Sequence, residues 1–144
     1  MKIVLIKKTS YQFEYNITRA NKKAELITLD TKTYLLHDIC HYAVEKILNY
    51  PNGFWGMLAQ GYSFNELFGK SNPMISGLRF IEKIVGPVQS VYSGHIPIED
   101  FNQYISHLNF TINENDLTSC LAEIKTILNA WEQLPIGEKL TLEF

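Results

Sequence analysis

Four ionisable side chains with chemically useful spacing stand close together in one stretch of the sequence. They are His37, Asp38, His41 and Glu45, within the segment LHDICHYAVEKILNYPNGFWGMLAQG, residues 36–61. On a helix of about 100° per residue, positions four apart differ by only about 40°, so His37, His41 and Glu45 would line one edge. Two imidazoles at this spacing can bind one divalent metal ion, and a carboxylate one turn later can add a ligand. These three residues are therefore candidate ligands of a divalent metal cofactor.

Asp38 is the candidate catalytic residue of this segment. The string His37-Asp38-Ile39-Cys40-His41 differs from the HExxH zinc helix because aspartate replaces the glutamate that acts there as general base. Aspartate is one methylene shorter, which changes its reach toward a metal-bound water. A carboxylate in the first turn of a helix is also favoured by the unpaired backbone N–H groups of that turn, so Asp38 has a structural explanation as well.

The two histidines allow two interpretations. They are either a hydrogen-bonded structural pair at the junction of sheet and helix, or they contact a metal ion or another ligand. Glu45 can contact His41 or remain in water under either interpretation. A metal site requires both imidazoles to converge on one ion at about 2.0–2.1 Å, whereas a structural pair points them at separate partners. His95 and His107 lie far away in sequence, and their spacing selects neither of them as a further ligand.

Residues 53–56, Gly-Phe-Trp-Gly, follow the helical segment as an aromatic turn. The glycines would let a ligand approach closely, so Tyr42 and Trp55 could border a polar pocket. Alternatively, Phe54 and Trp55 fill the core at a tight turn between helices. The candidate pocket residues are His37, Asp38, His41, Tyr42, Glu45 and Trp55.

The HDxxH motif and the glycine-framed aromatics together resemble a family of small bacterial proteins without an established activity. The resemblance rests on ten residues: His37, Asp38, His41, Tyr42, Val44, Glu45, Gly53, Phe54, Trp55 and Gly56. It covers the middle quarter of the chain and, more loosely, Trp131 and the C-terminal string LPIGEKLTLEF. The resemblance implies a bacterial, cytoplasmic protein and carries no catalytic assignment.

Composition limits the classes of protein to which the chain can belong. A length of 144 residues with 46% hydrophobic content suits a single domain, residues 1–144, with its own core. The net charge of -2 and the scattered basic residues argue against nucleic acid or an anionic membrane as partner.

No run approaches the roughly 18 apolar residues of a membrane span. Cys40 and Cys120 lack metal-binding spacing and fall at apolar helical positions, which indicates reduced core thiols and a cytoplasmic location.

Strand patterns begin and end the chain. Residues 2–7, 11–18 and 24–29 predict a three-stranded meander, and the second segment alternates aromatic or aliphatic with polar residues. Residues 139–144 alternate in the same way and predict a final strand that joins the meander. The pattern leaves open whether this strand pairs with the first or the third strand.

Helical spacing dominates the region between these strands. The expected helices cover residues 36–50, 54–59, a looser piece at 62–68, 73–85, 97–108 and 114–134. Ser71-Asn72-Pro73 would cap the fourth, which Gly86-Pro87 should end or kink, and Asn113 would cap the last. The chain is therefore predicted to be an α+β protein with a small, mainly antiparallel sheet packed against four to five helices.

These patterns favour a soluble binding or interaction module with a polar pocket around the HDxxH segment and without a catalytic metal. The alternative is a divalent-metal-dependent hydrolase in which His37, His41 and Glu45 hold the ion and Asp38 handles a proton. A third hypothesis is a homo-oligomer formed through the aromatics of residues 62–68 or an open sheet edge. Serine hydrolases, P-loop proteins and dinucleotide-binding proteins are disfavoured, because their usual motifs are missing.

Overall fold

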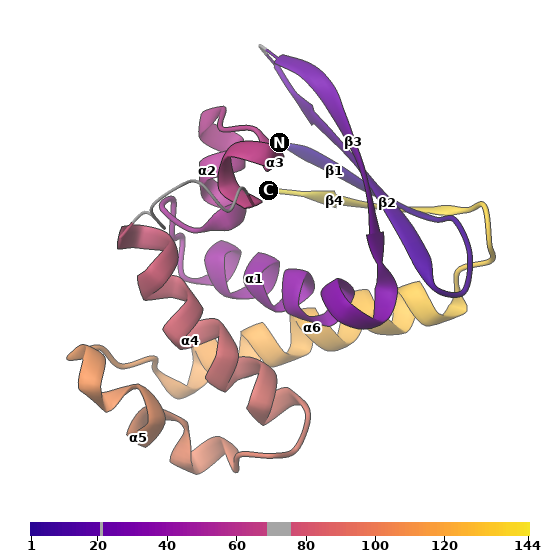
Figure 1. Cartoon of the computed structure of the whole chain (residues 1–144). Coiled ribbons are helices and arrows are strands. Elements are labelled where there is room, and N and C mark those ends of the chain that lie inside the picture. The colour runs from indigo at the N-terminus through magenta and orange to yellow at the C-terminus, as the bar shows by residue number, and fades with distance from the viewer. Residues whose placement is uncertain (21, 69–75) are drawn as a thin grey trace.

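The computed structural model describes residues 1–20, 22–68 and 76–144. Four strands form one antiparallel sheet in the order β3-β2-β1-β4: β1 (Lys2–Lys7), β2 (Gln12–Arg19), β3 (Lys22–Asp30) and β4 (Lys139–Glu143). The predicted sheet is confirmed, and its open question is answered because β4 pairs with β1, with Ile3 opposite Leu142. The two ends of the chain therefore lie side by side (Figure 1).

The sheet has one buried face and one face toward water, as the alternation of its residues predicts. The fully buried side chains of the two central strands are Ile3, Leu5, Phe13, Tyr15 and Ile17. Their neighbours in sequence, such as Glu14 and Thr18, point to the other face and are partly or fully exposed. The long helices of the described residues consequently lie on one side of the sheet (Figure 1).

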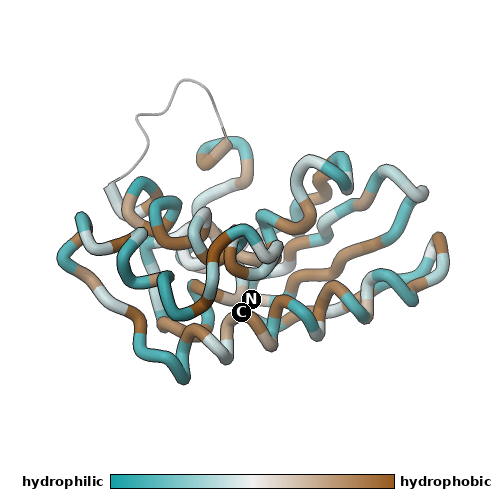
Figure 2. The backbone as a smooth tube through the Cα atoms, turned by 90° about the horizontal axis from the view of Figure 1, so that it is seen from below, coloured by the Kyte–Doolittle hydropathy of each residue, from teal (hydrophilic) through white to brown (hydrophobic). Residues whose placement is uncertain are grey.

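Six α-helices are present among the described residues, and they confirm the α+β class. They are α1 (Leu36–Ile47), α2 (Phe54–Gln60), α3 (Phe64–Phe68), α4 (Ser76–Tyr92), α5 (Phe101–Ile105) and α6 (Glu114–Gln133). The segment predicted as one helix over 97–108 is divided, because short 3₁₀ turns at Ile98–Asp100 and Ser106–Leu108 flank α5. Hydrophobic and hydrophilic residues alternate along the helices (Figure 2), which is the pattern of helices with one face on a core.

Helix α1 is the centre of the molecule. A single π-helical turn, Thr31–Leu35, leads into it, and the Asp30 carboxylate accepts the Thr33 N–H at 2.8 Å to begin that turn. Every residue from Asp38 to Glu45 is buried, because the sheet covers one side of α1 while α4 and α6 pack on the others (Figure 1). Buried polar side chains on this helix must therefore find hydrogen-bond partners inside the protein.

Helix α4 continues through Gly86 and Pro87 to Tyr92, so the predicted end of the helix at this point is wrong, while the alternative, a kink, stays a prediction. Proline inside a helix lacks the N–H that would donate to the carbonyl four residues earlier. Buried apolar residues lie on both sides of the proline: Ile84, Val85 and Val88. Their burial offsets the missing hydrogen bond. The predicted cap, Ser71-Asn72-Pro73, lies outside the described residues.

Arg19 holds α2 and α3 to the β2–β3 hairpin. Only 8% of this residue is exposed, and its guanidinium donates to the carbonyls of Leu58 and Tyr62 at 3.2 Å each. It also forms an ion pair with Glu25, whose other oxygen accepts the Phe64 N–H at 2.8 Å. This chain of contacts fixes the two short helices against the sheet.

Three further predictions concern the cysteines, membranes and self-association. Cys40 and Cys120 are free and fully buried, as predicted, and burial raises the pKa of each thiol to about 12. Across the described ranges, no helix is long and apolar enough to span a bilayer. Of the aromatics named for self-association, Phe64 is buried whereas Tyr62 and Phe68 are exposed, and oligomerisation stays a prediction.

Candidate metal centre

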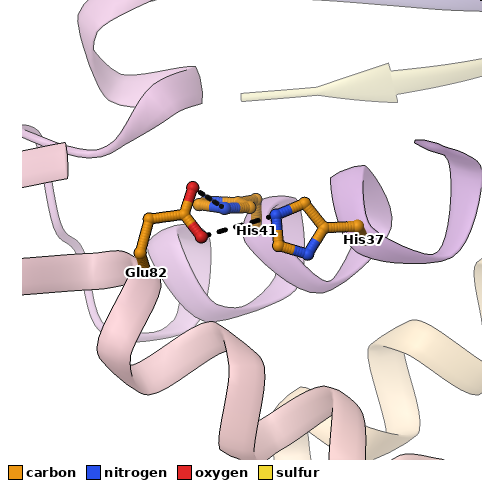
Figure 3. A group of neighbouring side chains, drawn as sticks. All are labelled: His37, His41 and Glu82. Atoms are coloured by element: carbon orange, nitrogen blue, oxygen red, sulfur yellow. Dashed lines mark hydrogen bonds and ion pairs between the residues drawn. The ribbon is translucent and has the colours of Figure 1, made fainter. Parts of the chain in front are cut away.

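His37 and His41 leave α1 one turn apart, and both rings point toward Glu82 of α4 (Figure 3). The His41 Nε2 atom lies 3.1 Å from Glu82 Oε1, and the His37 Nε2 atom lies 3.5 Å from Glu82 Oε2. One donor atom from each residue lies within 4.8 Å of the other two. Two imidazole nitrogens and one carboxylate therefore face a single small region.

The outer nitrogen of each ring is held by a separate partner. His37 Nδ1 lies 3.0 Å from Gln89 Oε1, and His41 Nδ1 lies 2.9 Å from Glu45 Oε1. A neutral imidazole that donates its Nδ1–H to such an acceptor carries its lone pair on Nε2. In neutral rings bonded in this way, both Nε2 lone pairs would face the region beside Glu82, whereas a protonated His41 donates its Nε2–H to the Glu82 carboxylate instead. Metal-binding histidines are commonly oriented by this kind of second hydrogen bond.

The distances around Glu82 can be compared with those of a metal site. Ligand atoms that each lie about 2.0–2.2 Å from a tetrahedral ion are roughly 3.3–3.6 Å apart. The separations of 3.1 and 3.5 Å are close to this range but run to different oxygens of Glu82, and the donor atoms as a group lie within 4.8 Å of one another, so one ion would require the side chains to move closer together. Glu82 and Gln89 are seven residues apart on α4, which is about two turns, so both face α1.

Glu45, the predicted third ligand, bonds to His41 but does not belong to the group formed by His37, His41 and Glu82. Its side chain is fully buried, and Oε1 accepts hydrogen bonds from His41 Nδ1–H and from the Phe54 N–H at 2.8 Å. Oε2 accepts the Gly56 N–H at 3.0 Å, so the carboxylate also caps α2. The i+4 spacing does place Glu45 beside His41, but against the opposite ring nitrogen. Glu82 stands where the sequence interpretation placed Glu45.

Asp38 lies beside this group with only 3% of the residue exposed. The Tyr15 hydroxyl donates to Asp38 Oδ2 at 3.2 Å, and Trp55 Nε1–H donates to the Asp38 backbone carbonyl at 3.0 Å. Burial raises the pKa of the Asp38 carboxyl to about 7, although His41 and the Tyr15 hydroxyl oppose the shift. Asp38 is thus an acidic group in a mostly apolar environment, which is a common property of functional carboxyls.

A pocket of about 340 Å³ opens beside these residues. Its polar side consists of His37, Asp38, His41 and Glu82. Its other side, which we call the apolar wall, consists of Tyr34, Phe54, Leu67, Phe68 and Leu78. Another pocket, of about 370 Å³, is lined by residues such as Lys46 and Tyr50 but contains no histidine. Of these two pockets, the one of about 340 Å³ is therefore the better candidate for a functional site, because it contains the imidazole groups.

Two predicted pocket residues lie in the core instead. Tyr42 follows His41 by one position, so its side chain points about 100° away, and its hydroxyl donates to the Glu143 carbonyl of β4 at 2.8 Å. Trp55 is fully buried and packs edge-to-face on Tyr15 with centroids 5.2 Å apart. Its role is to fill the core behind Asp38, whereas the neighbouring Phe54 reaches the pocket.

Hydrogen bonding dominates the electrostatics of the group. Burial lowers the pKa of His41, but its bonds to Glu45 and Glu82 outweigh this effect and raise the pKa to about 9. The bond to Glu82 also raises the pKa of His37. Both histidines in turn hold the pKa of Glu82 well below its usual range. The region beside Glu82 therefore attracts positive charge, whether a proton or a metal ion.

Comparisons with protein-family models, curated proteins and solved structures found no match. The interpretation of the site is therefore based on its own geometry.

Glu82 and Gln89 are the site residues that the sequence interpretation missed. Both lie on one edge of the apolar stripe of α4, where Leu78, Glu82, Val85 and Gln89 repeat at spacings of four, three and four. This edge pattern is a usable signal for residues that face a neighbouring helix. It identifies no partner, because many exposed helices carry a glutamate at the border of their apolar stripe.

Proposed function

We propose that the protein is a binding module whose pocket holds a divalent transition-metal ion. The protein ligands are His37 Nε2, His41 Nε2 and the Glu82 carboxylate, which leave at least one coordination position open toward the pocket. The observation that carries this proposal is the convergence of both Nε2 atoms on Glu82 at 3.1 and 3.5 Å. Both Nδ1 atoms are meanwhile fixed by other partners, as in metal sites with a second layer of hydrogen bonds.

A purely structural pair of histidines explains less of this geometry. The bonds from the Nδ1 atoms to Gln89 and Glu45 would suffice to position both rings. The side chains of Glu82 and His37 are 41% and 37% exposed, and an ion pair that water reaches on both sides contributes little to stability. The position of its carboxylate between both imidazoles is better accounted for by a shared ligand.

Calorimetric titration of chelator-treated, tag-free protein with Zn²⁺ or Co²⁺ tests this proposal. We expect one ion per chain, and Glu82→Gln should weaken binding by at least about 100-fold because a ligand is lost. Glu82 is partly exposed, so this variant should still fold. His107→Ala changes an exposed histidine outside the group and serves as the control. Absence of stoichiometric binding, or unchanged affinity in Glu82→Gln, would contradict the proposal.

Hydrolysis is a second candidate function, favoured by the position of Asp38. Its carboxyl lines the same pocket as the three candidate ligands, and Tyr15 holds one of its oxygens. In such a reaction Asp38 takes a proton from the attacking water and returns it to the leaving group. Asp38→Asn should then retain Co²⁺ binding and lose turnover of esters or amides. Metal-loaded protein that hydrolyses neither class would count against this second candidate.

A further inference from the structure

The apolar wall of the pocket is made of aromatic rings that pack on one another and are partly exposed. The Phe68 ring packs against Tyr34 and Phe54 with centroids 6.1 and 5.6 Å apart, and it stacks on Phe64 at 4.6 Å. Despite these contacts, 45% of Phe68 is exposed. A packed aromatic surface exposed beside a pocket is one that an apolar ligand can cover.

The charges of the pocket restrict the polar part of a ligand. Among the described residues that line it there is no lysine or arginine, while Asp38 and Glu82 both contribute carboxyl groups. Phosphate groups are usually bound by arginine, lysine or several backbone N–H groups. A ligand with several negative charges would meet two carboxyl groups here, and among the described lining residues nothing but the metal ion would offer a strong positive charge. A single donor group that binds the ion suits this arrangement better.

We propose that the pocket takes a small ligand with an aromatic or branched aliphatic body and one oxygen-donor head, and that it discriminates against phosphate esters. The head binds the ion, and the body covers Phe68 and Tyr34 within the pocket of about 340 Å³. A pocket of this size is at the small end of the usual range for ligand sites. The proposal rests on the metal site proposed above, because the ion holds the head.

Two hydroxamates that share one metal-binding head test the apolar wall. In Co²⁺-loaded protein the visible spectrum reports first on the metal and then on the ligand that joins it. Benzohydroxamate should bind on the order of tenfold or more tightly than acetohydroxamate, because only its ring reaches the apolar wall. Inorganic phosphate at the same concentration should leave the spectrum unchanged.

Variants of the wall show whether this preference comes from the proposed surface. Phe68→Ala and Tyr34→Ala should each reduce the preference to within about threefold, with the affinities for Co²⁺ and acetohydroxamate unchanged. Tyr104→Ala alters an exposed tyrosine outside the pocket and should keep the preference.

Three results would overturn the ligand proposal while leaving the metal site intact. The first is equal affinity of the two hydroxamates for the wild-type protein, and the second is a preference that survives in both wall variants. The third is a spectral response to phosphate as strong as that to benzohydroxamate. Failure to bind Co²⁺ at all is a different outcome, since it contradicts the metal site and removes the ligand proposal with it.

Discussion

Glu45 connects the candidate metal ligands to the rest of the fold through a single buried carboxylate. It accepts hydrogen bonds from His41 and from the backbone N–H groups of Phe54 and Gly56. A glutamine here would present an amide NH₂ to at least one of these donors. We expect Glu45→Gln to lower the free energy of unfolding by about 2–3 kcal/mol, because a buried donor loses its acceptor.

Urea denaturation of matched variants measures this effect. Glu123→Gln is the control, because Glu123 pairs with Lys46 at 3.3 Å where both side chains are partly exposed. Its loss should stay below about 0.5 kcal/mol. Losses of the same small size in both variants would show that Glu45 does not cap α2 as described.

The raised pKa of His41 predicts a pH dependence of stability in the metal-free protein. Its pKa is about 9 in the folded protein against an ordinary value of 6.5, so folding binds this proton more tightly. The resulting stability is fully present below about pH 6.5 and is lost as the pH rises through 9. The pKa of Asp38 is also higher in the folded protein, about 7 against an ordinary value of 3.8. Its deprotonation therefore also lowers the stability as the pH rises, but over a lower range, from about 3.8 to 7.

Denaturation of metal-free protein between pH 6.5 and 9 should therefore show a falling free energy of unfolding, by on the order of 1–3 kcal/mol. Saturating Zn²⁺ should remove this fall, because the ion has already displaced the protons. A flat profile without metal would contradict the proposed contacts of His41.

At the scale of elements, two glycines allow α2 to approach α1. A Cβ atom on Gly53 would overlap the Glu45 carboxyl group, and one on Gly56 would overlap the Pro51 carbonyl. We expect Gly53→Ala to cost about 2–4 kcal/mol, since the buried carboxylate must leave its partners. Thermal or urea unfolding measures the cost.

Gly86→Ala in α4 is the matched control for this substitution. A Cβ atom there meets nothing within 4 Å, and alanine is the better helix former. This variant should gain about 0.5–1 kcal/mol. A neutral or stabilising Gly53→Ala would contradict the close approach of Glu45 to the start of α2.

The spacing of apolar residues predicted most of the helices and strands, because side chains repeat every two residues on a strand and about every 3.6 residues on a helix. The alternation of Phe13, Tyr15 and Ile17 predicted β2 and its buried face, and the apolar stripe predicted α1. Local rules were insufficient at Pro87, where burial on both sides keeps α4 helical. The expected end of the helix at Gly86-Pro87, one of the two outcomes predicted there, is the kind of prediction that tertiary packing overrides.

At the scale of the whole molecule, the site depends on the packing of α1 against α4. The sequence suggested His37, Asp38 and His41 as candidates, because they are close together on one helix. Glu82 is 41 residues from His41, and no local spacing could join them. The assignment of Glu45 as third ligand failed to anticipate this packing, which brings a different carboxylate to the Nε2 side of His41.

An ion that joins α1 to α4 should stabilise the entire fold. A ligand that binds only the folded state at about 100 times its dissociation constant adds about 2.7 kcal/mol. We therefore expect saturating Zn²⁺ to raise the melting temperature of the wild-type protein by several degrees, as calorimetry would measure. Glu82→Gln should lose this increase, and an equal increase in both proteins would place the ion elsewhere.

The most direct test of the metal site is an anomalous difference map from crystals of the Co²⁺-loaded protein, recorded at the cobalt absorption edge. The proposed site predicts one strong peak at about 2.0–2.2 Å from His37 Nε2, His41 Nε2 and a Glu82 carboxylate oxygen. A strong peak at other residues, or no peak in crystals whose protein contains stoichiometric cobalt, would contradict it.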